Sequence, residues 1–271
     1  MDLQLKGKRA IVTGSTAGIG VGIAQSLARE GVRVAINGRS ERRGLEVVEQ
    51  IRAEGGDAVL ALGNVATDEG ADAAVAATLA AFGGVDILVN NAGGFAGSGS
   101  MTTVFDVTPD EWMRTIDMNV GAAIRMIQRL APAMKEAGWG RIIQITSGIA
   151  MTPSGNTPDY AGAKAALVNL NLGTAKSLAN TGVTVNAISP GTIFTRSVRA
   201  WFKTIGAREG WGDDMAKSEA WVLENQFPQM VPRIGRVEDI GDAVAYLASP
   251  RADFIDGVHL RVDGGASQSI S

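Results

Sequence analysis

Short apolar segments alternate with segments of helical periodicity from one end of the chain to the other. Seven apolar runs are predicted to be buried strands, at residues 9–14, 32–37, 58–63, 85–90, 140–146, 183–189 and 257–262. Between them, apolar residues recur every three or four positions, as at Ile19, Ile23 and Leu27, which predicts helices. Longer helices are predicted at 109–136 and at about 158–180. This alternation predicts an α/β fold, in which a parallel sheet is covered by helices on both faces.

No linker, repeat or block of charge divides the chain, so residues 1–271 are expected to form a single domain. The segment 192–232 differs from the rest, because aromatic residues gather there among mixed charges (Phe194, Trp201, Phe202, Trp211, Trp221, Phe227). It is too long for a turn. It is either a peripheral helical pair on the edge of the sheet or a lid over a ligand. The lid is favoured, because the segment adjoins the motifs described below.

The amino-acid composition argues against several kinds of partner and chemistry. The net charge of −3 argues against nucleic acid as the main partner. The chain has no cysteine, which excludes disulfides and thiolate chemistry, and its one histidine, His259, lies in a strand-like run and is expected to be structural. A metal site is therefore not expected. The N-terminus lacks the layout of a signal peptide and no long apolar run occurs, so we expect a soluble, cytoplasmic protein with no membrane partner.

The sequence TGSTAGIG (13–20) follows the first predicted strand and opens the first predicted helix. This is where backbone N–H groups and the helix dipole would hold a dinucleotide pyrophosphate, although such a turn also occurs for packing alone. The second strand ends in Asn37-Gly38-Arg39-Ser40, without the carboxylate that would bind the ribose hydroxyls of NAD. Arg39 could instead meet a 2′-phosphate, so NADP(H) is favoured over NAD(H). The alternative is that Arg39 stacks on adenine or points to solvent.

Tyr160, one of two tyrosines, precedes Lys164 by four residues, so the two side chains could meet on one helix face. The pair alone is weak, but it completes an ordered series of motifs: TGSTAGIG, NNAG (90–93), Asn119, Ser147, YAGAK (160–164), PG (190–191) and DGG (263–265). Together these resemble the short-chain dehydrogenase/reductase family, including its 3-oxoacyl-reductase-like members, along essentially the whole chain. The resemblance implies a Rossmann-type, doubly wound, seven-stranded parallel sheet. It also implies reversible hydride transfer between NAD(P)H and a carbonyl or alcohol.

The resemblance assigns four catalytic residues. Tyr160 would be the general acid that protonates the carbonyl oxygen, and Lys164 would favour the phenolate and bind the nicotinamide ribose. Ser147 would orient the substrate oxygen, and Asn119 would complete a water-linked proton path to Lys164. The cofactor would contact a larger set: Gly14, Ser15, Thr16, Gly18, Ile19, Gly20, Arg39, Asn64, Val65, Asn91, Ala92, Gly93, Tyr160, Lys164, Pro190, Gly191, Ile193 and Thr195.

Two positions depart from the pattern of the family. Asn64 stands where many relatives have aspartate, and its amide can still accept a hydrogen bond from adenine. Ala17 stands where several NADP-dependent relatives have a basic residue, which weakens the NADP prediction. The hydroxyl groups of Ser15, Thr16 and Ser40 could compensate.

The substrate is left open by these motifs. The segment 192–232 and the loop 94–107 both follow carboxyl ends of strands and are expected to flank the carbonyl site. Their apolar residues, with Met151, favour a fairly apolar pocket and a medium-sized ketone or secondary alcohol (Phe95, Met151, Phe194, Trp201, Phe202). One alternative is a 3-oxoacyl thioester on an acyl carrier protein, although no basic docking patch is identified. Another is a nucleotide sensor without catalysis.

The two long predicted helices, 109–136 and 158–180, carry apolar residues on more than one side. Such helices could pack against a partner subunit as well as the sheet. With the family resemblance, this pattern predicts a homotetramer.

Overall fold

The computed structural model describes residues 1–95 and 102–267. Within these residues the chain forms a seven-stranded parallel sheet in the order β3-β2-β1-β4-β5-β6-β7. The strands are β1 (Arg9–Val12), β2 (Arg33–Gly38), β3 (Asp57–Leu62), β4 (Ile87–Asn90), β5 (Gly140–Ile145), β6 (Val183–Pro190) and β7 (His259–Val262). Each predicted strand is found, with ends that differ by a few residues at most.

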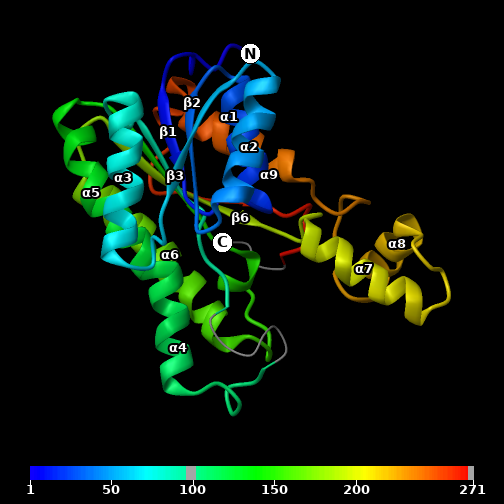
Figure 1. The fold of residues 1–271 in the computed structure, drawn as a ribbon. Coiled ribbons are helices and arrows are strands. Elements are labelled where there is room, and N and C mark those ends of the chain that lie inside the picture. The colour runs from blue at the N-terminus through cyan, green and yellow to red at the C-terminus, as the bar shows by residue number, and fades with distance from the viewer. Residues whose placement is uncertain (96–101, 268–271) are drawn as a thin grey trace.

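The helices are α1 (Ile19–Arg29), α2 (Glu41–Ala53), α3 (Asp68–Phe82), α4 (Pro109–Ile116), α5 (Ala122–Glu136), α6 (Pro158–Ser177), α7 (Arg196–Arg208), α8 (Met215–Asn225) and α9 (Val237–Ala248). They cover both faces of the sheet, as Figure 1 shows for α3 and α5 on one side and α1 and α2 on the other. The sheet is doubly wound, as predicted.

Alternate strand residues point into two separate apolar cores. One contains Ile23 and Leu27 of α1 and Val244 of α9, and the other contains Val75 of α3 and Met126 of α5. Because β5 and β6 are buried along their whole length, their sequences are mostly apolar rather than alternating, although each also buries polar side chains such as Gln144 and Asn186. The strand order reverses between β1 and β4, and parallel sheets bind ligands at the carboxyl ends of the strands beside such a reversal.

The predicted helix 109–136 is interrupted. α4 and α5 are joined by a five-residue π-helical turn, Asp117–Gly121. One extra residue per turn shifts the face that the chain presents, and such turns are frequent at functional sites. Asn119 lies at the centre of this turn and is only 1% exposed.

The segment 192–232 contains α7 and α8, which pack on each other around an apolar cluster of their own. Figure 1 shows this helical pair projecting away from the sheet. Phe202 is fully buried in the cluster, and the Phe194 ring lies 5.7 Å from it. The prediction that these two rings line a substrate pocket is therefore wrong for Phe202, whose side chain packs between α7 and α8.

His259 lies on the edge strand β7, with Nε2 3.0 Å from the Thr146 hydroxyl, and the contact ties β7 to the end of β5. Burial lowers the pKa of its imidazole. This is the structural role expected from the sequence. No helix in the described ranges is long and apolar enough to span a membrane. The predicted loop 94–107 falls partly on residues 96–101, which lie outside the described residues.

Candidate active site

The glycine-rich turn between β1 and α1 is shaped by close approach of backbone. Gly14 and Gly18 have φ values of 64° and 63°, in the left-handed region that favours glycine. A Cβ on Gly14 would lie 2.9 Å from Cα of Ala92, and one on Gly20 would lie 2.6 Å from the carbonyl oxygen of Gly14. Side chains at either position would push the turn away from β4.

The turn is held by side chains from both neighbouring strands. The Thr13 hydroxyl accepts hydrogen bonds from the N–H groups of Asn91 (3.0 Å) and Ala92 (2.9 Å), and Asn91 Nδ2 donates to the Thr13 carbonyl at 2.9 Å. From β2, Asn37 Oδ1 accepts from Gly14 N at 3.3 Å. The first turn of α1 has no side-chain cap, so its N–H groups face the site without a side-chain partner.

A cavity of about 500 Å³ opens at this end of the sheet. Of the predicted cofactor residues it is lined by Gly14, Thr16, Ile19, Arg39, Asn64, Val65, Asn91, Ala92, Gly93 and Thr195. No aspartate or glutamate lines it within the described part of the chain. Uncapped helix N–H groups, a glycine cradle and the absence of carboxylates fit an anionic dinucleotide.

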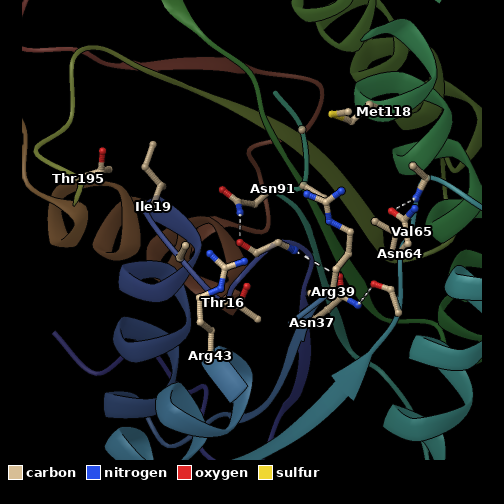
Figure 2. A pocket seen from close by; sticks show the side chains of 17 residues that line it. Thr16, Ile19, Asn37, Arg39, Arg43, Asn64, Val65, Asn91, Met118 and Thr195 are labelled. Carbon is tan, nitrogen blue, oxygen red and sulfur yellow. Dashed lines mark hydrogen bonds between the residues drawn. The ribbon is translucent and has the colours of Figure 1, made fainter. Parts of the chain in front are cut away.

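Two arginines reach this cavity. Figure 2 shows the guanidinium groups of Arg39 and Arg43 among the side chains that line it. Arg43 was not among the residues predicted from sequence. The sequence did not distinguish Arg43 from its neighbour Arg42, which lies in the same first turn of α2, pairs with Glu46 and does not line the cavity.

Some predicted cofactor residues lie elsewhere. Ser15 is fully buried, its hydroxyl donates to the Val12 carbonyl at 2.7 Å, and its N–H donates to Asn37 O at 2.8 Å. It therefore has no donor left for a ligand, contrary to the prediction. Gly191 and Ile193 line a separate cavity of about 390 Å³ behind the end of β6, and Pro190 is the last residue of that strand.

Ser147, Tyr160 and Lys164 come together where β5 ends and α6 begins. The Ser147 hydroxyl is hydrogen-bonded to the Tyr160 side chain, and Lys164 Nζ lies 5.5 Å from the centre of the Tyr160 ring. Lys164 is 3% exposed and donates to the Ile145 carbonyl at 2.9 Å. The three residues predicted as catalytic are therefore neighbours in space.

Burial controls the protonation of this cluster. Burial raises the pKa of Tyr160 to about 12, partly offset by the Ser147 hydrogen bond. Burial lowers the pKa of Lys164 to about 8. The sequence reasoning expected Lys164 to favour the phenolate, but in the protein alone desolvation dominates. At neutral pH both groups hold their protons, so Tyr160 is available as an acid.

Asn119 does not contact Lys164 directly. Its Nδ2 donates to the carbonyl groups of Gly94 and Thr115, both at 2.8 Å, and its Oδ1 accepts from Gly94 N at 3.1 Å. Gly93 lies between Asn119 and Lys164: a Cβ there would be 2.3 Å from Asn119 Oδ1 and 3.3 Å from Lys164 Nζ. Only glycine fits between them.

A cavity with a glycine-rich turn at the carboxyl ends of the strands, connected through Gly93 to a Ser–Tyr–Lys cluster, is typical of nucleotide-dependent α/β oxidoreductases. The chain belongs to the short-chain dehydrogenase/reductase family: residues 8–206 match the family described as short chain dehydrogenase. It is 35% identical to the uncharacterized oxidoreductase YvaG of Bacillus subtilis (strain 168), covering 100% of both chains. It is 33% identical to the 3-oxoacyl-[acyl-carrier-protein] reductase FabG of Staphylococcus aureus (strain N315), covering 95% of this chain and 97% of FabG.

Solved structures agree with this assignment. The L-sorbose reductase of Gluconobacter frateurii, complexed with NADPH and L-sorbose, superimposes with a TM-score of 0.90 at 32% identity over 100% of both chains. The protein is thus a short-chain dehydrogenase/reductase enzyme.

Proposed function

We propose that this enzyme reduces a medium-sized, fairly apolar ketone with NADP(H) in preference to NAD(H). The observation that carries the proposal is the contact of Tyr160 with Ser147, beside a cavity that two arginines and no carboxylate line within the described residues. When bound, the nicotinamide dinucleotide would supply the hydride, or accept it in the reverse direction. The likeness to an L-sorbose reductase complexed with NADPH supports the choice of cofactor.

The residues of this chain would divide the work. The uncapped N–H groups of α1 and the glycine cradle would hold the pyrophosphate, and Arg39 and Arg43 the 2′-phosphate. Ser147 would hold the carbonyl oxygen, and Tyr160 would give it a proton. The positive charge of Lys164 would stabilise the phenolate that remains, and a proton from solvent, passed along the water-linked path that Asn119 would complete, would restore the phenol. Because Tyr160 keeps its proton at neutral pH, it can donate that proton to a carbonyl oxygen, as ketone reduction requires.

Reduction of a 3-oxoacyl thioester is the second candidate, supported by the likeness to FabG. A carrier protein would need a basic docking patch. On the surface of α5, Arg125 pairs with Asp117 and Arg129 pairs with Asp68 and Asp72. These arginines are already neutralised, which favours the simple ketone. A nucleotide sensor is less favoured, because Ser147, Tyr160 and Lys164 are assembled together.

We also propose that the enzyme is cytoplasmic and forms one domain over 1–271, with α7 and α8 as a substrate lid. The proposed homotetramer is supported by exposed apolar side chains on α4 and α6, Met113 (63%) and Leu172 (47%). Light scattering should give a mass four times that of the chain, and a monomer would contradict the proposal.

The test is oxidation of NADPH and NADH, followed at their absorbance band, against apolar ketones, sugar ketones, steroids and acetoacetyl thioesters. Rapid turnover of an apolar ketone with NADPH is expected. Turnover of thioesters alone would replace the proposal by the second candidate. Absence of any turnover by a protein that binds NADPH tightly would favour the sensor.

A further inference from the structure

The Phe95 ring lies on the Tyr160 ring. Their centroids are 4.5 Å apart and their planes are tilted by 39°. This is within the range in which two aromatic rings attract each other. Phe95 is 39% exposed, so one side of its ring meets the phenol and another part meets solvent. Phe95 thus covers part of the ring of Tyr160, the residue that would donate the proton.

The backbone before Phe95 is held firmly. Asn119 binds both hydrogen-bonding groups of Gly94, donating to its carbonyl at 2.8 Å and accepting from its N–H at 3.1 Å. Asn119 is itself almost fully buried in the π-helical turn. The Gly94 peptide groups are therefore fixed, and rotation about the side-chain bonds of Phe95 remains the easiest movement of the ring.

The structure offers space for that rotation. A cavity of about 480 Å³ is lined by Phe95 together with Arg39, Ala66, Gly93, Gly94, Arg114, Asp117 and Met118. It shares Arg39, Ala66, Gly93 and Met118 with the cofactor cavity. Phe95 thus touches Tyr160 and also borders an open space next to the cofactor site.

We propose that Phe95 is both the gate and the apolar wall of the substrate site: its ring rests on Tyr160 and rotates toward the adjoining cavity when a ketone enters. This rests on the proposed function, since it takes Tyr160 as the proton donor. Phe194 and Phe202 belong to the α7–α8 cluster, which leaves Phe95 as the aromatic ring in contact with Tyr160 among the described residues. An aromatic wall selects an alkyl or aryl group beside the carbonyl over a polyhydroxylated one.

The cover over Tyr160 can be tested without turnover. Tetranitromethane modifies accessible tyrosine rings, and the chain has two tyrosines, Tyr160 and the 38% exposed Tyr246. Tyr246 lies on α9 and serves as a reference within the same molecule. Mass spectrometry of the peptides should show that Phe95→Ala raises nitration of Tyr160 relative to Tyr246 by about three- to tenfold, the value of one aromatic pair. Phe95→Leu, which keeps an apolar cover, should give a smaller rise. An unchanged ratio in Phe95→Ala would overturn the gate.

The wall is tested by kinetics on two substrates, an aryl alkyl ketone and a polyhydroxylated ketone. Phe95→Ala should raise KM for the aryl ketone about tenfold and leave kcat within a factor of a few, while KM for the polyhydroxylated ketone stays unchanged. Equal changes for both would refute the wall. If the wild-type enzyme reduces no ketone, the proposed function and the wall fail together, whereas the nitration ratio still decides whether Phe95 covers Tyr160.

Discussion

Replacement of Arg39 and Arg43 by alanine, singly and together, tests how this enzyme chooses its cofactor. Both guanidinium groups line the cavity at the end of β2, and neither has an ion-pair partner among the described residues. A phosphate bound there would be the anion that they lack. NADH has no such phosphate, so the substitutions should weaken the use of NADPH without changing the use of NADH.

The magnitude follows from the exposure of these groups. Hydrogen bonds to charged partners are stronger than neutral ones, but both arginines are exposed and solvent screens them. The lower end of the range applies, so each substitution should lower kcat/KM for NADPH by about tenfold. Since both would contact one phosphate, the double variant should lose between about tenfold and a hundredfold rather than the full product. The value of kcat/KM for NADH should stay the same.

The assay is steady-state oxidation of each cofactor at fixed ketone concentration, repeated at low and high salt. Added salt should weaken NADPH more than NADH, and this difference should shrink in the double variant. Arg42→Ala is the matched control, because Arg42 pairs with Glu46 and does not line the cavity. An equal loss for both cofactors in Arg39→Ala, or a wild-type preference for NADH, would refute the reasoning.

Four further predictions concern the catalytic cluster. Tyr160→Phe should lower turnover by at least about a hundredfold while NADPH binding, followed by tryptophan fluorescence, survives. The rate of ketone reduction should hold through neutral pH and fall above about pH 8, because Lys164 loses its charge there while Tyr160 keeps its proton to about pH 12. Lys164→Met should abolish turnover yet raise the unfolding free energy at pH 7, by up to about 3 kcal/mol. Gly93→Ala should lower kcat by about a hundredfold, because its Cβ would displace Asn119.

These predictions carry their own controls. The lowered pKa of Lys164 means that the unfolded chain binds its proton more tightly, so wild-type stability should rise between about pH 8 and 10.5. The advantage of Lys164→Met should fade over the same interval, and a variant less stable than wild type at pH 7 would contradict the argument. Gly173→Ala, on the open surface of α6, places a methyl group where no atom lies within 4 Å and should leave kcat unchanged. Loss of NADPH binding in Tyr160→Phe would mean that Tyr160 holds the cofactor rather than the proton.

Much of this protein is determined by local sequence. Central strands of a parallel sheet are buried on both faces and therefore mostly apolar, and apolar runs of strand length made the seven strands recognisable. The turn at Gly14 and Gly18 is encoded by residues that tolerate positive φ, and the spacing of Tyr160 and Lys164 fits one helix turn. The absence of a carboxylate at the end of β2 can likewise be read from the sequence, because the residues that follow a strand in space also follow it along the chain.

Other features were decided by the tertiary structure. Ser15 lies in the glycine-rich turn and was expected to contact the cofactor. Its hydroxyl instead donates to the carbonyl of Val12 in β1. Phe202 was expected in a pocket, but a helix that projects from the sheet has to bury its apolar face, and α8 covers it. The contact of Phe95 with Tyr160 joins residues that are 65 positions apart in the chain. It depends on the hydrogen bond by which Asn119 holds the backbone of Gly94. Burial set the pKa of Tyr160 and Lys164, because desolvation depends on every atom that surrounds a group, wherever it lies in the chain.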